Sequence, residues 1–411
     1  MSAAAPTTSF DPFDPDYIRD PYPVLARMRI ETPVAFAPAV GAYVVSKHAD
    51  VDAILLDSAT FSSARPNFSF APLCPEAIEQ FKNHIGPNVT AFCDPPKHTE
   101  VRKHNMRVMS ARRLKLLEPA IREKAAKLID QFPTVGETDL VSALAFPLPA
   151  LTIYSLIGFP ESDRDLLKSW ATDRLVMMGG RPTPAEQIRI TQQMARYWQY
   201  CESFVSLRAS TRADDLASDL LGISDQEPQT LSHRDIAAVL YSVSVAGHET
   251  TTNLILNLIR QLMIHRSQWD AIVADPTLIP GAVEEGLRYD NSGFTAFRTT
   301  KVPVTIRGVD IPAGSTVICM LSAANRDEER FKDSESFNIR RKDGRFHLGF
   351  GRGIHLCLGN ALATLEVRIV LEMLSKRFPN MELAPDQILT YPPNITFRGP
   401  TALRLRLNGV T

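Results

Sequence analysis

A glycine-rich stretch near the C-terminal end of the chain holds the residues with the clearest chemical potential. The letters GFGRGIHLCLGNALA (349–363) place four glycines, His355 and Cys357 at the start of an apolar, helix-like segment. A dinucleotide-binding loop would need a further glycine at position 354, where the chain has Ile, and the Gly-Lys-Ser/Thr of a phosphate-binding loop is absent. A buried structural cysteine is common, but it explains neither the glycines nor the histidine.

A metal-bound thiolate explains the whole pattern of this loop. A coordinating thiol is deprotonated and is stabilised by backbone N–H groups around its sulfur, and glycines let the backbone approach that closely. The segment that follows predicts a helix whose positive N-terminal end points at the sulfur. Its apolar face consists of Leu358, Leu362, Leu365 and Ile369. Because zinc needs three or four protein ligands, a single cysteine suits haem iron better.

The loop resembles the haem-binding loop of the cytochrome P450 family. The stretch FGRGIHLCLG (350–359) matches that family at each characteristic position, namely Phe350, Gly351, Gly353, His355, Cys357 and Gly359. The resemblance implies haem b as the cofactor, with Cys357 as the axial ligand of its iron. A thiolate ligand pushes electron density toward the iron and favours cleavage of the O–O bond.

A second motif, AGHETT, lies in the longest apolar helical pattern of the chain. A zinc-protease HExxH motif fails here because position 252 is Thr. A threonine inside a helix usually bonds only to the preceding turn, but a carboxylate in an apolar helix is costly to bury. The resemblance implies that Thr250 hydrogen-bonds dioxygen and its water, and that Glu249 relays protons. It also implies that the small Ala246 and Gly247 open a groove beside the iron.

An ExxR pair, Glu285 and Arg288, follows that helical pattern and precedes the cysteine loop. Charged residues three apart on a helix usually form a solvated surface pair. The resemblance implies instead a buried ion pair that holds the segment beneath the haem. The chain departs from the family pattern at Ser336, where an arginine partner of this pair is common. Either Arg340 or Arg341 could replace that arginine, and the sequence does not decide between them.

The haem carboxylates require cationic partners. His98 and Arg102 stand four residues apart, which places them on one face of a helix. By resemblance these two residues, together with Arg298 and His355, would bind the haem propionates.

Several segments are expected to line a substrate pocket. Apolar and small polar side chains in these segments would favour a lipophilic or aromatic substrate with one polar group, although each apolar member is also typical of plain core. The predicted pocket residues are Tyr241, Val243, Ser244, Phe294, Thr295, Phe297, Ile395 and Phe397.

The composition of the 411-residue chain is that of an ordinary globular protein. It is 44% hydrophobic, and its net charge of −1 points neither to nucleic acid nor to a membrane surface as a partner. No apolar run approaches the roughly 18–20 residues that a bilayer span needs, and the N-terminus lacks the regions of a signal peptide. The five scattered cysteines form no disulfide framework or zinc ribbon, so we expect a cytoplasmic protein.

Helical patterns dominate the chain from His98 onward, with small strand-like pieces elsewhere. We predict two strands within 33–46, a helix at 48–57, long helices over 98–132 and 231–266, and a helix break at 178–184. Residues 65–93 are expected to be irregular, and 302–321 to form a hairpin around Pro312–Gly314. The fold class is mainly α with small β-sheets: a single cytochrome P450 domain over 1–411 around a buried haem, with a disordered segment at 1–14.

These expectations combine into a haem-thiolate monooxygenase. It would insert one oxygen atom of O₂ into a small lipophilic or aromatic substrate, by hydroxylation or O-demethylation. Since the chain has no flavin or nicotinamide domain, a ferredoxin and its NAD(P)H-dependent reductase would supply electrons to the enzyme, which is expected to be monomeric. The alternatives are a haem-thiolate peroxygenase, isomerase or dehydratase, which need no proton relay to O₂, and a non-enzymatic haem sensor. Candidate residues for a basic docking patch are Arg102, Lys103, Arg107, Arg112, Arg113 and Arg352.

Overall fold

Two compact units, each assembled from separate stretches of sequence, make up the chain in the computed structural model. The structure describes residues 5–65, 69–87 and 89–408. The first unit comprises Met1–Ser62, Ala125–Ala145 and Thr250–Thr411, and the second comprises Ser63–Lys124 and Phe146–Glu249. The single domain expected over 1–411 stays a prediction.

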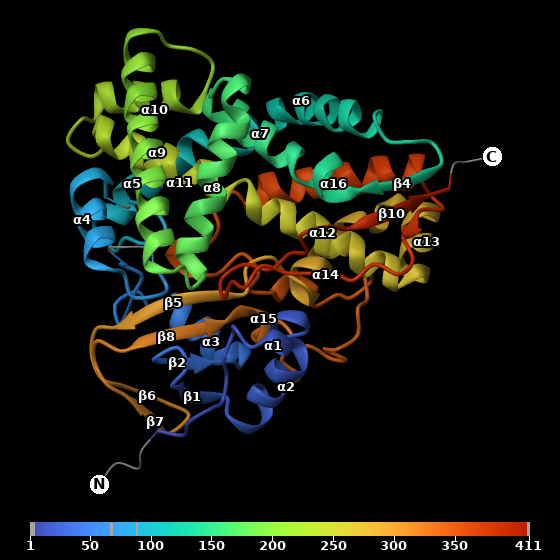
Figure 1. Cartoon of the computed structure of the whole chain (residues 1–411), viewed down its shortest axis with the longest axis horizontal. Coiled ribbons are helices and arrows are strands. Elements are labelled where there is room, and N and C mark those ends of the chain that lie inside the picture. Colours follow the sequence, from blue (N-terminus) through green and yellow to red (C-terminus); the bar gives the residue numbers. More distant parts are fainter. Residues whose placement is uncertain (1–4, 66–68, 88, 409–411) are drawn as a thin grey trace. The chain divides into compact units, whose positions relative to one another are not determined.

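The first unit contains a five-stranded sheet with the order β1-β2-β8-β5-β3 (Figure 1). Strands β1 (Val34–Ala37) and β2 (Ala42–Val45) form an antiparallel pair, which confirms the two strands predicted within 33–46. Strand β2 pairs in parallel with β8 (Thr316–Met320), and β8 pairs antiparallel with β5 (Thr295–Thr300). The short strand β3 (Phe61–Ser62) pairs with the other edge of β5. Strand β5 is therefore held in register from both sides.

Helix α3 (His48–Leu56) packs against this sheet, as the sequence predicts for 48–57. Its apolar residues Val51, Ile54 and Leu55 share one core cluster with Val45 and Val317 of the strands. Burial of each such side chain stabilises the folded state by roughly 1.5–3 kcal/mol relative to leaving it exposed. The helix is thus fixed on the sheet, and its other contacts support the cysteine loop.

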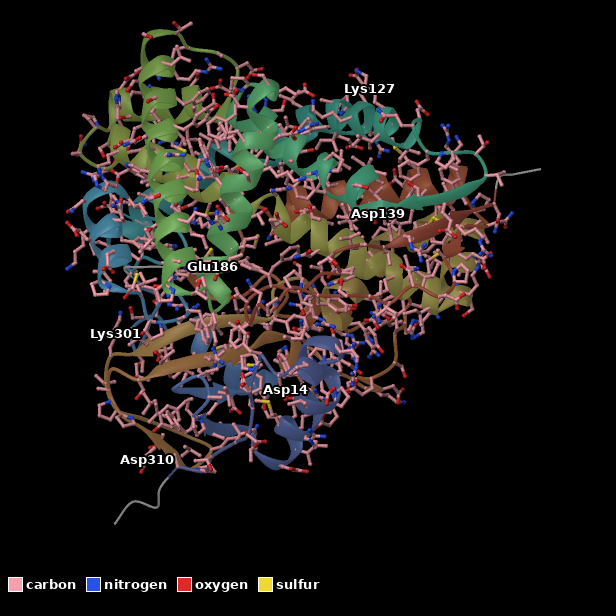
Figure 2. The ribbon with its side chains drawn as sticks, viewed as in Figure 1. Asp14, Lys127, Asp139, Glu186, Lys301 and Asp310 are labelled. Atoms are coloured by element: carbon pink, nitrogen blue, oxygen red, sulfur yellow. The ribbon has the colours of Figure 1, made fainter. Side chains whose placement is uncertain are left out.

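The other elements of the first unit are mainly helices, and a smaller sheet has the order β4-β10-β9. Asp14 caps the first helix, because its carboxylate accepts the N–H groups of Asp16 and Tyr17 (Figure 2). The elements are α1 (Pro15–Arg19), α2 (Tyr22–Glu31), β4 (Gly136–Asp139), η1 (Val141–Ala145), α12 (Glu249–Ile264, whose first residue belongs to the second unit), α13 (Arg266–Ala274), η3 (Pro276–Leu278), α14 (Ile279–Tyr289), β6 (Val304–Ile306), β7 (Val309–Ile311), α15 (Leu321–Ala324), η4 (Gly344–Phe346), η5 (Gly353–His355), α16 (Asn360–Arg377), β9 (Glu382–Leu383) and β10 (Arg404–Leu407).

Two expectations for the first unit are wrong. The hairpin within 302–321 turns at Arg307 and Gly308, both with positive φ, so that β6 pairs with β7; Pro312–Gly314 only connects β7 to β8. The segment 1–14 is not disordered where it is described. Thr7 forms a bridge to Phe36 of the edge strand β1, and backbone hydrogen bonds join Pro6 and Thr8 to Phe36. Phe10, which follows, is buried.

The second unit is helical throughout its regular elements. Its longest helix, α9 (Pro184–Ser210), begins with a capping box between Thr183 and Glu186, the latter labelled in Figure 2. This helix packs against four others, α4, α8, α10 and α11. The elements are α4 (Pro75–His84), α5 (Lys97–Val108), α6 (Ala111–Ile129, whose last turn lies in the first unit), α7 (Pro147–Ile157), η2 (Glu161–Asp163), α8 (Arg164–Gly179), α9, α10 (Leu216–Gln226) and α11 (His233–Ala246).

The two long segments predicted to be helical are helical, but each consists of two helices instead of one. The pattern over 98–132 is divided between α5 and α6, and the pattern over 231–266 is divided between α11 and α12. Helix α11 begins with a capping box between Ser232 and Asp235, and the predicted break at 178–184 is confirmed. Residues 65–93 are not wholly irregular, because α4 lies within them.

Among the residues that the structure describes, none of the helices combines the length and the apolar character that crossing a bilayer requires.

Candidate active site

The cysteine loop of the first unit is closed by its own backbone. The N–H of Cys357 donates to the carbonyl of Phe350 over 2.9 Å, and the N–H of Gly351 donates to the carbonyl of Leu348 over 2.8 Å. Between these bonds lies the tight turn η5. The loop therefore returns on itself and presents Cys357, which is half-buried, at a defined place.

Glycine is required in this loop because the backbone is left-handed and closely packed. Gly351 and Gly353 have φ angles of +70° and +67°. A Cβ atom on Gly353 would lie 2.6 Å from the carbonyl oxygen of Leu55 in α3. The neighbouring Arg352 forms an ion pair of 3.1 Å with Asp52 of the same helix. Helix α3 thus supports the loop from one side.

The predicted helix after the cysteine is confirmed as α16, which begins directly after Gly359. Leu362 and Ile369 are buried, whereas Leu358 and Leu365 are only half-buried. The apolar face inferred from the sequence is therefore the packed face at two of its four positions.

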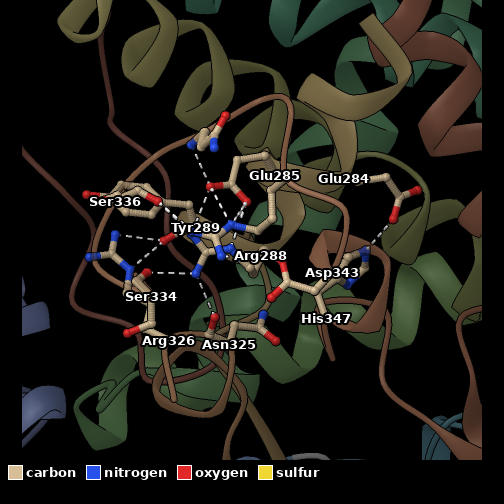
Figure 3. A network of polar contacts seen from close by, with 12 residues as sticks. Glu284, Glu285, Arg288, Tyr289, Asn325, Arg326, Ser334, Ser336, Asp343 and His347 are labelled. Atoms are coloured by element: carbon tan, nitrogen blue, oxygen red, sulfur yellow. Dashed lines mark hydrogen bonds and ion pairs between the residues drawn. The ribbon is translucent and has the colours of Figure 1, made fainter. Parts of the chain in front are cut away.

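Glu285 and Arg288 of α14 form a fully buried ion pair (Figure 3). Two guanidinium nitrogens of Arg288 donate to the carboxylate over 2.7 and 2.8 Å. The carboxylate also accepts the N–H of Asn338 over 2.7 Å. Arg288 in turn donates to the carbonyls of Ser334 and Ser336, over 2.8 and 3.0 Å. The pair is therefore internal, with several charge-assisted hydrogen bonds that offset its desolvation.

The structure identifies the arginine that takes the place left by Ser336. The Nε atom of Arg341 lies 3.3 Å from a carboxylate oxygen of Glu285, and the Arg341 side chain is only 6% exposed. Arg341 also donates to the carbonyls of Lys332 and Asp333. Arg340, the other candidate, is exposed. The second cation of this cluster is therefore Arg341.

Asn325 connects the ion pair to the cysteine loop. Its backbone carbonyl accepts Nη1 of Arg288 over 3.0 Å, and its side-chain oxygen accepts the N–H of Leu348 over 2.6 Å. The side-chain nitrogen donates to the carbonyl of Leu287 over 3.2 Å. The sequence analysis did not select Asn325; its only signal was a place in the ANRD stretch ahead of the loop.

The other site residues predicted in the first unit lie on the sheet and near the loop. Arg298 lies in strand β5, is 8% exposed, and donates to the carbonyl of Phe297 over 2.8 Å. His355 ends the turn η5 two residues before the cysteine.

The structure brings together the predicted pocket residues of the first unit. The N–H of Phe294 donates to the carbonyl of Thr396 over 2.7 Å, and the hydroxyl of Thr295 donates to the carbonyl of Ile395 over 3.1 Å. A bridge also joins Gly293 to Phe397. The segments 293–297 and 394–397 therefore lie side by side, although they are about a hundred residues apart in the sequence.

In the second unit, His98 and Arg102 lie on α5, as their spacing predicts. His98 is 3% exposed. Burial, with a smaller contribution from the positive charge of Arg102, lowers the pKa of His98. An anionic group bound beside these two side chains would oppose that fall in the pKa of His98.

The break between α11 and α12 sets the positions of the AGHETT residues. Ala246 is exposed although Ser244, Val245 and His248 around it are buried. A Cβ atom on Gly247 would lie 2.7 Å from the side chain of Ile153, so this glycine permits the close approach of α7. Helix α12 starts at Glu249, with Thr250 as its second residue.

Glu249 lies in a polar cluster with residues of α8. The hydroxyl of Thr172 donates to its carboxylate over 3.2 Å, and the carboxylate is 14% exposed. Burial raises the pKa of Glu249, and the Thr172 hydrogen bond and the charge of Lys168 oppose that rise. His248 is buried against the ring of Phe146, and its pKa falls to about 3, mainly because of burial. The imidazole is therefore neutral at physiological pH.

The predicted pocket residues of α11 differ in exposure. Tyr241 and Ser244 are buried, and the hydroxyl of Tyr197 donates to Ser244 over 2.5 Å. The guanidinium of Arg174 lies 4.2 Å from the ring centre of Tyr241. Val243 is half-buried. Partners within the unit thus contact the Ser244 hydroxyl and the Tyr241 ring. A substrate contact by Tyr241, Val243 or Ser244 stays a prediction.

The residues present fit a haem group held by one thiolate. The loop that presents Cys357 is closed by its own backbone hydrogen bonds and turns at two left-handed glycines, Gly351 and Gly353. Each unit also offers side-chain donors suited to carboxylates, with Arg298 and His355 in one and His98 and Arg102 in the other.

Comparisons with known proteins give one consistent result. The family profile described as "Cytochrome P450" matches residues 181–394. The chain is 37% identical to "Cytochrome P450 monooxygenase PikC" of Streptomyces venezuelae, over 98% of this chain and 95% of that protein. It is 34% identical to "Cytochrome P450 107B1" of Saccharopolyspora erythraea, over 92% of each chain. A similar solved structure, "cytochrome P450 CREJ in complex with (4-ethylphenyl) dihydrogen phosphate", has a TM-score of 0.92 and 36% identity, with 97% of this chain and 99% of that chain covered.

Proposed function

Because the chain belongs to the cytochrome P450 family, we propose that it is a haem-thiolate monooxygenase that inserts one oxygen atom of O₂ into a small lipophilic or aromatic substrate, by hydroxylation or O-demethylation. The family binds haem b through a thiolate and is a family of oxidoreductases. The observation that carries the proposal is the loop that fixes Cys357, with its left-handed glycines and its link through Asn325 to a buried ion pair.

The haem would be held by residues of the loop and by separate cations. Cys357 would ligate the iron, and the closed backbone from Phe350 to Gly359 would keep its sulfur in place. Arg298, His355 and the pair of His98 and Arg102 would bind the carboxylates. When bound, the haem supplies the oxygen chemistry, and the thiolate favours cleavage of the O–O bond.

Proton handling would belong to Glu249 and Thr250. The carboxyl of Glu249 is nearly buried and its pKa is raised, so this group takes up a proton more readily than an exposed glutamate. The hydroxyl of Thr250, the next residue, would orient dioxygen and water. Ala246 is small and exposed, so it leaves space at this part of the helix.

The substrate class is supported by apolar side chains and by similar proteins. Phe294, Phe297 and Ile395 are buried and Phe397 is half-buried, within two segments joined by hydrogen bonds. Relatives bear the names "Vitamin D(3) 25-hydroxylase" and "Erythromycin C-12 hydroxylase", and the similar solved structure holds (4-ethylphenyl) dihydrogen phosphate. These names support a lipophilic or aromatic substrate for this chain.

Electrons would come from a ferredoxin and its NAD(P)H-dependent reductase to a monomeric, cytoplasmic enzyme. Of the basic residues considered for docking, Arg107 and Arg113 form ion pairs with Glu227 and Asp214. Lys103 and Arg112 are exposed. These exposed cations are therefore the better candidates for contact with an acidic partner.

A haem-thiolate peroxygenase, isomerase or dehydratase is the alternative, together with a haem sensor. Such proteins have no need of a proton relay for O₂, and the contacts of Glu249 argue against them. Product formation driven by NADH, ferredoxin and reductase, with peroxide removed by catalase, supports the monooxygenase. Product formed only with added peroxide supports a peroxygenase instead.

The first experiment is the absorption spectrum of the reduced protein with carbon monoxide. We expect a strongly red-shifted Soret band, which marks a thiolate ligand, and its loss in Cys357→Ser. The matched control is Cys319→Ser, because Cys319 is fully buried in strand β8 of the same unit. A red-shifted band that persists in Cys357→Ser would contradict the proposed ligand.

A further inference from the structure

Arg398 directly follows the predicted pocket segment 394–397 and contacts four separate parts of the first unit. The first of these parts is α1. The Nη1 and Nη2 atoms of Arg398 donate to the carbonyls of Ile18 and Arg19, over 2.6 and 3.0 Å. Ile18 and Arg19 are the last two residues of α1, and the last carbonyls of a helix need partners from outside it. The guanidinium therefore caps the C-terminal end of α1, where a positive charge is favourable.

The backbone of Arg398 joins this segment to two further elements. Its N–H donates to the carbonyl of Ser292, just ahead of β5, over 2.9 Å. Its carbonyl accepts the side-chain nitrogen of Asn257 in α12 over 3.0 Å. The next residue, Gly399, lies so close to α12 that an added Cβ atom would clash with the side chain of Asn253. The chain after the pocket segment therefore lies directly against α12.

Two aromatic rings lie near the Arg398 guanidinium. Its Cζ atom is 3.6 Å from the ring centre of Tyr391 and 5.8 Å from the ring centre of Phe294. Both distances are within the range of a cation–π contact. Phe294 is a predicted pocket residue, and its N–H donates to the carbonyl of Thr396 over 2.7 Å. Arg398 thus contacts a side chain of one pocket segment and continues the backbone of the other.

The position of the segment 394–397 depends on individual contacts of this kind. The described residues between β9 and β10 form no helix or strand, although Phe397 makes a single bridge to Gly293. Asn394 closes the turn locally, because its Oδ1 atom accepts the N–H groups of Thr396 and Phe397 over 2.8 and 3.0 Å. That local turn fixes the shape of the segment. The contacts of Arg398 fix where the segment lies.

We propose that Arg398 is a positioning residue that sets the shape of the substrate pocket, because it ties the segment 394–397 to α1, to the start of β5 and to α12. The N-terminal helix α1 thereby influences which substrates bind. This inference rests on the proposed function, in which the segments 293–297 and 394–397 line the pocket. A ligand that extends to this wall should bind more weakly without Arg398, whereas a ligand confined to the iron should not.

Hydrogen exchange measured by mass spectrometry tests the positioning itself in the full-length holoenzyme. Exchange over 292–298 and 394–398 should become faster in Arg398→Ala, because the hydrogen bonds between these segments open more often. Arg398→Lys keeps the charge but loses the planar fork, so its effect should be intermediate. The matched control is Arg406→Ala, which removes an exposed arginine of β10. Unchanged exchange in both Arg398 variants overturns the inference.

Tyr391→Leu provides a second route to the same test. It removes the ring that packs on the guanidinium and leaves Arg398 itself in place. We expect faster exchange over the same two segments, by less than in Arg398→Ala. If Arg398→Ala does not retain haem, Arg398→Lys and Tyr391→Leu decide the test, and wild-type exchange in both overturns the inference.

Two haem ligands of different length test the effect on the pocket. Imidazole occupies the iron alone, whereas 4-phenylimidazole adds an apolar ring that extends into the pocket, and both are titrated by the shift of the Soret band. We expect Arg398→Ala to weaken binding of 4-phenylimidazole by about 2- to 30-fold relative to imidazole. A general loss of stability would affect both ligands alike, and Arg406→Ala should keep the wild-type ratio. A wild-type ratio in Arg398→Ala overturns the role in the pocket.

A different observation would refute the proposed function. If the reduced wild-type protein gave no red-shifted Soret band with carbon monoxide, the haem-thiolate function would fall. The exchange measurement does not depend on that band, so it would still decide whether Arg398 holds the two segments together.

Discussion

Glu285 and Glu249 both have little contact with solvent, but the structure holds their carboxyl groups in opposite ways. Glu285 is fully buried in the first unit and is matched by Arg288, Arg341 and a backbone N–H. Glu249 of the second unit has a side chain that is 14% exposed and that accepts a hydrogen bond from the Thr172 hydroxyl. The charge of the partly buried Lys168 also acts on it. Burial is similar at the two sites, but the number of donors differs greatly.

The number of donors separates a carboxylate that holds the structure together from a carboxyl group that can exchange a proton. A carboxylate with several fixed, charged donors stays ionised and holds its surroundings in one arrangement. A carboxyl with few donors in a buried site has a raised pKa, so it keeps its proton to a higher pH than an exposed carboxyl does. Glu285 therefore suits the support of the cysteine loop, and Glu249 suits proton transfer.

The largest effect is expected from the removal of Arg288. Arg288→Ala leaves Glu285 buried beside a single cation, and breaking such a pair costs about 3–5 kcal/mol. Urea unfolding followed by circular dichroism measures the loss. Glu284→Ala is the control, because Glu284 is 40% exposed and lies 3.4 Å from His347. Equal losses in both variants would contradict the structural role of the pair.

A smaller effect should distinguish Arg341 from Arg340. Arg341→Ala removes a charged partner of Glu285 and hydrogen bonds to two backbone carbonyls. Loss of these charged contacts should lower the free energy of unfolding by roughly 1.5–3 kcal/mol. Arg340→Ala removes an exposed side chain and should change the free energy of unfolding by less than about 0.5 kcal/mol. The same urea titration compares them, and the reverse order would show that Arg340 is the true partner.

The smallest effect concerns stability and pH at Glu249. Burial raises the pKa of Glu249 in the folded state above its value in the unfolded chain. The free energy of unfolding therefore falls as the pH rises from the pKa of the unfolded chain to the pKa of the folded state. Glu249→Gln cannot ionise, and it should therefore be more stable than the wild type at neutral pH and nearly equal to it in mild acid. Thermal melts at both pH values test this, and a gain that is the same at both would contradict it.

Sequence patterns predicted local features better than long-range contacts. Periodic apolar residues predicted the helical regions over 98–132 and 231–266 and the helix after Cys357. The break at Gly247 was not predicted, because the apolar pattern continues through it while the approach of Ile153 requires a glycine. Hydrophobic periodicity reports burial, and it contains no information on whether a helix continues.

The same limit applies to the site. The loop around Cys357 was predictable because its glycines and cysteine are neighbours in the sequence. Asn325 and Thr172 were not predictable, because they reach their partners through tertiary contacts over 23 and 77 residues. An asparagine in a loop and a threonine in a helix are too common to indicate such contacts alone.

The arrangement around Ser336 has a consequence for the evolution of the chain. The carboxylate of Glu285 already has its cations, and the carbonyl of Ser336 accepts a hydrogen bond from Arg288. An arginine restored at position 336 would add a surplus charge rather than repair a loss, so its effect depends on what stands at position 341. We therefore expect the effects of substitutions at positions 336 and 341 to depend on each other.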